Sequence, residues 1–315
     1  MCVGALGLAF TASAGADQII GHGTPASCTS AHVVAAVRAG GVIRFSCGAA
    51  PVTIPMRATA KVHNTSRRVV IDGGGLVTLS GQGRRRILYL DTCDPAQQWT
   101  TSHCQDQAAP QLTIERLGLA DGNSTGQLFD GGGGGAIFDR GGRLRIVDSS
   151  FTDNRCDPTG PDIGGGAVRA LSQYRSEPVD VIDSRFSDNV CSNGGALSSI
   201  GVSWTVTGST FTSNRAIGDG ANPARTGTPG GGSGGAIYND GDQMALQVTH
   251  STFTGNHANE GGGAIFFVSD NRTGTLSIRD SRLTDNVNDG FQTAGLPGIF
   301  FLGAHPPSIV GSRLR

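Results

Sequence analysis

Lysine, aromatic side chains and charge are all scarce in this sequence. Only 16% of the 315 residues are charged, 6% are aromatic, and Lys61 is the single lysine. The formal net charge of −1 leaves no basic footprint for nucleic acid or for an anionic membrane surface. No segment reaches the ~18 consecutive apolar residues that a transmembrane helix needs. The sequence therefore predicts neither a nucleic-acid partner nor a transmembrane segment.

Glycine, in contrast, is abundant, with 50 residues. The glycines do not fall at every third position, which excludes a collagen triple helix. Disorder is also excluded, because a disordered chain needs high net charge and few β-branched residues. A folded chain of this length holds one large domain or two, and internal repetition decides between them.

The first residues have the pattern of an export signal. A mostly apolar run, Val3–Ala12, is followed by Ser13-Ala14-Gly15-Ala16 and then by the polar Asp17. Small residues at these positions suit signal peptidase, so we expect cleavage after Ala14 or Ala16. The predicted organisation is a signal peptide at 1–16, an N-terminal cap at 17–67 and a repeat domain at 68–315. The predicted location is secreted or cell-surface.

The cysteines agree with export. Six remain once Cys2 is removed with the signal peptide, and an even number in an exported chain predicts disulfides. No Cys/His spacing resembles a zinc site. Proximity in sequence suggests Cys28–Cys47 and Cys93–Cys104.

Two short motifs alternate along the second half of the chain. Gly-Gly-Ala followed by an aliphatic residue recurs five times, first at 134–137 and last at 262–265. Between these copies lie segments such as LRIVDSSFTDN from Leu144 and LQVTHSTFTGN from Leu246. Their residues alternate with a period of two and are rich in β-branched types, so each unit holds two or three short strands. Such a unit cannot bury its own apolar face and must stack on its neighbours, as the coils of a parallel β-helix do.

Stacked coils place equivalent residues in columns. One inward aliphatic column consists of Ile146, Val181, Val206, Val248, Ile278 and Ile309, and a second consists of Phe151, Phe186, Phe211, Phe253, Leu283 and Leu314. An asparagine column, expected at a turn, consists of Asn154, Asn189, Asn214, Asn256 and Asn286. Cys156 and Cys191 each follow their asparagine by two residues. Because adjacent coils lie about 4.8 Å apart, the register predicts a Cys156–Cys191 disulfide.

The two ends of the stack are predicted to differ. The segment 29–40 has Ser30 as a helix N-cap, apolar residues at helical spacing and Gly40 as a stop. A short amphipathic helix here would shield the open end of the apolar stack. The last copy of the repeat stops at Arg315 without a comparable segment. We expect either that a cap has been lost with the true C-terminus or that another chain associates through the uncapped C-terminal coil.

The alternating motifs resemble the polymorphic-membrane-protein repeats of bacterial surface proteins, within the pectate-lyase-like superfamily. The arginine bias is also typical of high-GC bacterial genomes. The resemblance covers about residues 68–315 and implies an all-β fold, a right-handed parallel β-helix with a short N-terminal amphipathic helix cap. It implies no activity, because the clustered aspartates and the Arg-x-Lys of the superfamily's hydrolases are absent. Gly21-His22-Gly23 is present but lies before the helix, in the wrong context.

The candidate binding residues follow the Gly-Gly-Ala motifs. Because the aliphatic residue of each motif is expected inward, its successor should point outward. These successors are Phe138, Arg169, Ser198, Tyr238, Phe266 and Phe300. An exposed column with four aromatics would suit stacking against sugar rings, unless the parity is reversed or loops cover the column. Trp99, on an insertion at 91–110, is a further candidate platform or a loop anchor, and a long glycine-rich insertion at 216–233 could wall a groove.

Catalytic candidates lie beside this column. Arg140 or Arg169 could clamp a uronate carboxylate or serve as a lyase base, with Asp139 next to them, although solvated turn residues have the same pattern. Asn239, Asp240 and Asp242 offer oxygen ligands for calcium, but Asn-Asp-Gly-Asp is equally ordinary turn chemistry. No other cofactor is implied.

Two functions remain open from the sequence. The first is a secreted protein that binds, and possibly cleaves in a lyase- or hydrolase-like way, an extracellular polysaccharide or cell-surface glycan. The second is a non-enzymatic surface or adhesin module, which the repeat type and the incomplete catalytic set favour.

Overall fold

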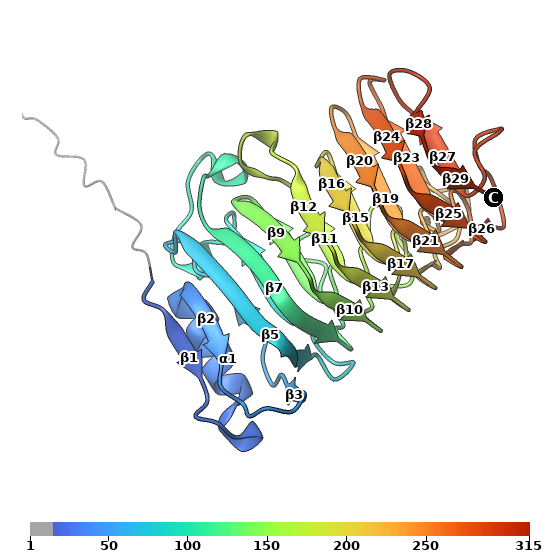
Figure 1. The fold of residues 1–315 in the computed structure, drawn as a ribbon. Coiled ribbons are helices and arrows are strands. Elements are labelled where there is room, and N and C mark those ends of the chain that lie inside the picture. The colour runs from blue at the N-terminus through green and yellow to red at the C-terminus, as the bar shows by residue number, and fades with distance from the viewer. Residues whose placement is uncertain (1–14) are drawn as a thin grey trace, which may run out of the picture.

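The computed structural model describes residues 15–315, so most of the predicted signal peptide, residues 1–14, lies outside the described residues. Strands dominate, and all 26 strand pairings between named strands are parallel because each strand pairs with its equivalent in the next coil. Successive coils lie side by side along one axis (Figure 1). The fold is therefore an all-β parallel solenoid, as the repeats predict.

The strands form three sheets, of which the smallest extends over only part of the stack. The large sheet has 17 strands, β1(Gln18–Ile20), β2(Gly41–Phe45), β3(Val52–Pro55), β5(Arg68–Ser80), β7(Gln111–Ala120), β9(Arg143–Val147), β10(Ser150–Thr152), β12(Val179–Ile182), β13(Arg185–Ser187), β16(Trp204–Thr207), β17(Thr210–Thr212), β20(Ala245–Thr249), β21(Thr252–Thr254), β24(Thr275–Arg279), β25(Arg282–Thr284), β28(Ser308–Val310) and β29(Arg313–Leu314). The second sheet has eight strands, β4(Ala60–Lys61), β6(Leu88–Asp91), β8(Ile137–Arg140), β11(Val168–Ala170), β15(Leu197–Ile200), β19(Ile237–Gly241), β23(Ile265–Ser269) and β27(Ile299–Leu302). The smallest has four, β14(Val190–Cys191), β18(Arg215–Ala216), β22(His257–Ala258) and β26(Val287–Asn288). Strands β2, β3 and β4 already pair in register with β5 and β6, so stacking begins before residue 68.

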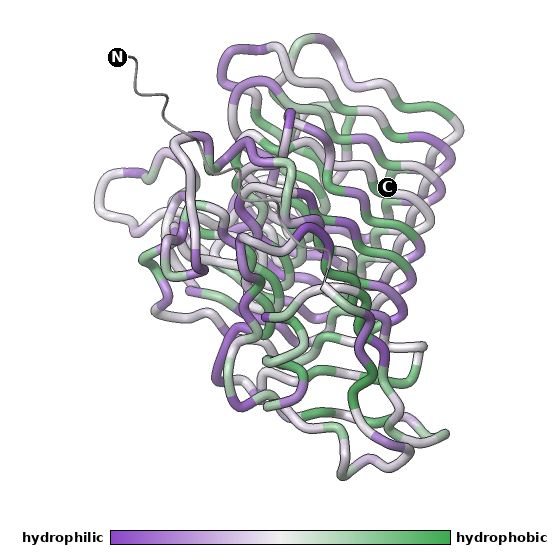
Figure 2. The backbone as a smooth tube through the Cα atoms, turned by 90° about the vertical axis from the view of Figure 1, so that its left-hand side faces the viewer, coloured by the Kyte–Doolittle hydropathy of each residue, from purple (hydrophilic) through white to green (hydrophobic). Residues whose placement is uncertain are grey.

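The predicted inward columns form the core. Val181 pairs with Ile146 and Val206, and these residues are fully buried. The rings of Phe151, Phe186, Phe211 and Phe253 stack with centroids 4.5–4.8 Å apart. The apolar segments recur at the same place in successive rungs (Figure 2). Each coil thus buries its apolar face against the coils on either side.

Buried asparagine and serine side chains join the coils at two turns. The Nδ2 of Asn189 donates to Oδ1 of Asn214 at 2.9 Å and to the carbonyl of Phe151 at 3.0 Å. The same bonds recur from Asn154 to Asn286. At the other turn, the Ser184 hydroxyl accepts from the backbone N–H of Ser149. These side chains supply the partners that buried turn backbone otherwise lacks.

Each coil bends between its two strands of the large sheet, and the backbone conformation at this bend explains why aspartate or glycine occurs there. Asp148 (φ 44°), Asp183 (φ 50°) and Gly208 (φ 61°) occupy this position in three successive coils. The left-handed region disfavours most side chains, whereas glycine and aspartate adopt it readily. The Asp-Ser and Gly-Ser pairs of the repeat therefore mark this bend.

Helix α1(Ser30–Ala39) lies at the N-terminal end of the stack (Figure 1). Its Val33, Ala36 and Val37 are buried and belong to the hydrophobic core. Thr29 caps the helix by accepting from the N–H of His32, so the predicted N-cap Ser30 is wrong by one residue. The Ser30 hydroxyl instead accepts from the backbone N–H of Arg57 at 2.8 Å and ties the helix to the following loop.

The structure contains the three predicted disulfides, Cys28–Cys47, Cys93–Cys104 and Cys156–Cys191. Cys156 and Cys191 lie on neighbouring coils with their Cα atoms 4.8 Å apart, the separation expected from the coil spacing. Four short 3-10 helices, η1(Pro25–Ser27), η2(Pro95–Gln97), η3(Cys104–Asp106) and η4(Tyr174–Ser176), lie in the connections. No helix among the described residues is long and apolar enough to cross a membrane.

Candidate functional site

The six residues predicted from the Gly-Gly-Ala motifs form one continuous row, together with Lys61 and Tyr89, on the outward side of the eight-stranded sheet. Strand pairing aligns them one above another, and we call them the outward row: Lys61, Tyr89, Phe138, Arg169, Ser198, Tyr238, Phe266 and Phe300. Their predecessors, such as Ile137 and Ile237, belong to the core. The predicted alternation is therefore correct.

The predicted exposure of the row is wrong. Phe138 and Tyr238 are fully buried, Phe266 is 3% exposed, and only Phe300 of the four predicted aromatics is half-buried. The rings stack on each other, with 4.9 Å between the centroids of Tyr238 and Phe266. Buried rings cannot offer their faces to a sugar.

Loop residues cover the row. The Arg86 guanidinium lies 4.8 Å from the Phe138 ring centroid, and the Asn222 amide donates to the Tyr238 hydroxyl at 2.8 Å. The loop that carries Asn222 is held by Arg225, which binds both carboxylate oxygens of Glu260 at 2.7 and 2.5 Å. The glycine-rich insertion at 216–233 therefore closes over the row instead of walling an open groove.

Arg169 is buried within the row, and its guanidinium is hydrogen-bonded to neighbouring residues. Its guanidinium is 1% exposed and donates to the Ser198 hydroxyl at 2.6 Å and to the Asp162 carbonyl. Burial lowers the pKa of Arg169 to about 10, so the group stays protonated at neutral pH. Arg169 can neither act as a base there nor reach a ligand in this conformation, which corrects both roles predicted for it.

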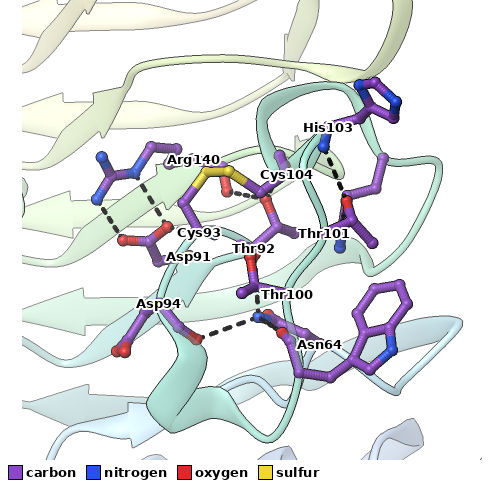
Figure 3. The surroundings of a disulfide bond; sticks show 12 residues. Asn64, Asp91, Thr92, Cys93, Asp94, Thr100, Thr101, His103, Cys104 and Arg140 are labelled. Carbon is purple, nitrogen blue, oxygen red and sulfur yellow. Dashed lines mark hydrogen bonds and ion pairs between the residues drawn. A yellow bond between two sulfur atoms is a disulfide. The ribbon is translucent and has the colours of Figure 1, made fainter.

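Arg140 and Asp139 lie on opposite faces of β8. Arg140 points outward and binds both carboxylate oxygens of Asp91, at 3.0 and 2.5 Å (Figure 3). Asp139 is fully buried and accepts from the Gln173 amide, while its Oδ1 has no partner. Burial raises the pKa of Asp139 well above its usual value. Strand alternation separates the two side chains, so they do not form one catalytic pair.

The predicted calcium ligands do not converge, for the same reason. Asn239 points inward, where its amide donates to the Ser199 hydroxyl at 2.7 Å and to the Val202 carbonyl at 2.9 Å. Asp240 points outward and accepts from the Tyr238 hydroxyl at 2.8 Å, and Asp242 is exposed. No group of three His, Cys, Asp or Glu suited to a metal occurs in residues 15–315. The expected oxygen cluster is therefore not formed by these three residues.

Trp99 lies on a loop that is tied down at several points. The Cys93–Cys104 disulfide closes the loop, and the Cys104 carbonyl accepts from the Thr92 hydroxyl (Figure 3). The Asn64 amide donates to the Trp99 carbonyl at 2.6 Å. Trp99 itself is half-buried.

A site that the sequence did not indicate opens beside α1. A cavity of about 760 Å³ is lined by one flank of the helix, by the loop at 57–66 and by Gln98. A second cavity of about 330 Å³ shares Val34, Arg38 and His63 with the first and extends to Lys61. We call the two together the basic groove, because its cations are Arg38, Arg57 and Lys61.

All of the charged side chains that line the basic groove are positive. No Asp or Glu of residues 15–315 lines either cavity, and none of its three cations forms an ion pair with a described residue. Burial and the Arg38 guanidinium lower the pKa of His63 below its usual 6.5, so the imidazole at the groove wall is neutral at pH 7. The groove thus offers unpaired positive charge beside apolar helix surface, which suits an anion with an apolar face.

Sequence reasoning missed this groove because its residues come from separate segments. From the sequence, Arg38 is expected on the exposed side of a helix, and Lys61 is a polar residue that precedes the predicted repeat domain. Only the packing of α1 against β4, the strand of Lys61, brings the segments together. A single signal was available, namely that the sole lysine and four arginines, including Arg38 and Arg57, fall within the predicted cap.

Comparison with known families supports the repeat but not a function. The repeat of the Chlamydia polymorphic membrane protein family matches residues 208–240 and 250–268. No curated protein and no solved structure matches the chain.

Proposed function

We propose that this chain is a secreted or cell-surface β-solenoid that binds an extracellular polysaccharide without cleaving it. One contrast carries the proposal. Of the two cations predicted to be catalytic, Arg169 is buried and Arg140 is paired with Asp91. The three cations of the basic groove are instead exposed and unpaired. The described surface therefore supports binding better than bond cleavage.

Cleavage of a glycosidic bond needs an acid or base positioned at the bond. Arg169 is covered and Arg140 is neutralised by Asp91, while Asp139 lies inside the solenoid. The basic groove contains cations, hydroxyls, amides and one neutral histidine, but no carboxylate of the described residues to pair with them. This composition favours retention of a ligand over its chemical conversion.

Export is supported by two further observations. Three disulfides join described cysteines, and such bonds persist mainly in oxidising compartments. The matched repeat is named for membrane proteins of Chlamydia. We extend the proposal to the finer features of the fold: a right-handed coil of the pectate-lyase-like type, with α1 capping its N-terminal end.

A polysaccharide panel tests the proposed function. The protein is run in gels containing uronate-rich or neutral polysaccharides, and parallel incubations are followed for unsaturated products that absorb ultraviolet light and for new reducing ends. We expect retardation by at least one polysaccharide and no products. Product formation would contradict the non-catalytic part, and the absence of retardation by every polysaccharide would contradict binding.

A second candidate is an adhesin module whose ligand is a protein, which the polymorphic-membrane-protein repeat favours. The two candidates differ in what removes the binding sites on host cells. Glycosidase treatment of the cells should abolish attachment of a polysaccharide binder, whereas protease treatment should abolish attachment of a protein-directed adhesin.

A further inference from the structure

We infer that the basic groove binds an acidic glycan, one whose sugar rings carry carboxylate or sulfate groups, and that Phe129 supplies a stacking platform at its outer end. This inference rests on the proposed function and specifies its ligand class and its site. It is carried by the charge of the groove, by its continuity with an exposed aromatic residue, and by its size.

The cations of the basic groove lack counterions among the described residues. Arg38, Arg57 and Lys61 line connected cavities without any described acidic residue, although the chain as a whole has a net charge of −1. Some exposed cations elsewhere have acidic neighbours, as Arg116 has Asp72 at 2.5 Å and Arg44 has Asp17 at 3.5 Å, whereas the groove gathers three unpaired cations around adjoining cavities. Arginine is well suited to planar, two-point recognition of a carboxylate. An anionic ligand would supply the counterions that the protein lacks here.

A buried ring, Tyr89, connects the groove cation Lys61 with an exposed aromatic side chain that lies outside the two cavities. The Lys61 ammonium lies 5.1 Å from the centroid of the Tyr89 ring, whose own centroid lies 6.3 Å from that of Phe129. Phe129 is 73% exposed and its neighbour Leu128 is 53% exposed, both on the glycine-rich loop before β8. Exposed apolar side chains beside a polar groove are typical of binding surfaces. Phe129 is therefore the aromatic that can stack on a sugar, in place of the buried Phe138 and Tyr238.

The size and lining of the groove fit a short stretch of sugars. Its main cavity, about 760 Å³, lies within the ~300–1,000 Å³ typical of ligand sites. Ala31, Val34 and Ala35 give the helix side an apolar floor, and Thr65 and Gln98 form a polar rim in which the threonine hydroxyl donates to the amide oxygen at 2.7 Å. Sugar rings have both apolar faces and hydroxyl edges, and so match both parts of this lining.

A nucleic acid fits the groove less well. Nucleic-acid affinity grows with the number of phosphates neutralised, and three cations on a chain of net charge −1 neutralise few. Single-strand binding also relies on several aromatic platforms, whereas Phe129 is the one largely exposed aromatic side chain among residues 15–315. We therefore assign the groove to an acidic glycan.

Charge-matched variants test the assignment. The groove variant is Arg38→Gln/Arg57→Gln/Lys61→Gln, and the control variant is Arg185→Gln/Arg282→Gln/Arg313→Gln, which removes the same charge from exposed arginines of the large sheet. Phe129→Ala is tested separately. Calorimetry measures binding to oligogalacturonate, to a heparin oligosaccharide, to a neutral glucan of equal length and to single-stranded DNA, and thermal melting verifies that each variant is folded.

We expect the wild-type chain to bind oligogalacturonate or the heparin oligosaccharide in preference to the glucan. The groove variant should bind about tenfold more weakly, because it loses three ion pairs to the ligand together, although each pair is weak alone. The control should bind within about twofold of wild type, because its arginines lie on the large sheet and not in the groove. Phe129→Ala should weaken binding by about threefold or more, and added salt should weaken binding by the wild-type chain.

Equal affinities of the groove and control variants would overturn the assignment but leave the proposed function standing. Equal binding of the neutral glucan would overturn the acidic ligand class, and DNA binding that depends equally on the groove would overturn the glycan class. Failure to bind any of the three glycans would contradict both this inference and the proposed function.

Discussion

Asp139 is an acid in the interior of the solenoid and has no use in the proposed function. It occupies the inward column otherwise formed by Leu90, Ala170, Ser199 and Asn239. Among residues 15–315 its only side-chain partner is the Gln173 amide, and one of its oxygens has none. Burial favours the protonated acid, which needs no counterion. The residue therefore carries a pH-dependent cost to stability.

The Asp139→Asn substitution should remove this pH-dependent loss of stability. The unfolded chain releases the proton near pH 3.8, whereas the folded chain keeps it to a much higher pH. The wild-type free energy of unfolding should therefore fall, through this residue, as pH rises above 3.8, by up to ~1.4 kcal/mol per pH unit until the folded pKa is reached. Urea unfolding from pH 4 to 8 should give free energies of unfolding for wild type and variant that coincide near pH 4 and diverge above it.

Asp242→Asn, at an exposed position, is the matched control and should show no such divergence. A constant difference across the pH range would contradict a neutral Asp139.

The stacked turns are the elements that fix the register of the coils. Fully buried Asn214 accepts from the backbone N–H of Asn189 at 3.2 Å and donates to the carbonyl of Phe186 at 2.9 Å. Asn286, at the end of the same column, makes the corresponding bonds but is half-buried. Water can replace the bonds of Asn286 and cannot reach those of Asn214.

Asn214→Ala should therefore destabilise the protein by about 3 kcal/mol, because it leaves a buried N–H and a buried carbonyl without partners. Asn286→Ala should cost about 1 kcal/mol, since its groups are partly solvated. Urea midpoints of the two variants measure the difference. Equal costs at both positions would mean that the column acts through turn conformation and not through its buried hydrogen bonds.

The insertions of the repeat fold over the outward row and bury it. The variable insertions enter before the Gly-Gly-Ala motif, and Asn222 on one of them bonds Asp162, Tyr238 and Asp240 at 2.8–3.1 Å. The insertion thus converts an outward-facing sheet surface into a second buried layer. The aromatic row stabilises the loops that lie over it.

At the scale of the whole molecule, the chain is nearly one-dimensional, since strands pair only with those of adjacent coils. Ser184 and Ser209 occupy equivalent positions in neighbouring coils, and Ser184 donates its backbone N–H to the Ser209 hydroxyl. Removal of residues 184–208 takes one complete coil and rejoins equivalent positions. The basic groove, built from residues 30–98, lies outside this coil.

Deletion of residues 184–208, combined with Cys156→Ala to remove the thiol left without its partner, should therefore give a folded, shorter solenoid. Its far-ultraviolet circular dichroism should remain that of a β protein, and its affinity for oligogalacturonate should stay within about twofold of the intact chain. Deletion of residues 184–203 is the control, because it leaves part of a coil and shifts every later column out of register. If the two deletions were equally disruptive, stacking would not be modular.

The amino-acid sequence by itself determined the solenoid, the inward columns and the Cys156–Cys191 bridge. Each of these follows from repetition, because one coil spacing and one strand alternation place every equivalent residue. Only the tertiary structure decided that Phe138, Arg169 and Tyr238 are covered, and that Arg38, Arg57 and Lys61 share a groove. Burial of the outward row depends on how non-repeating loops fold back, and the groove depends on how a single helix packs at the end of the stack. Neither arrangement repeats along the chain, so no periodicity in the residues records it.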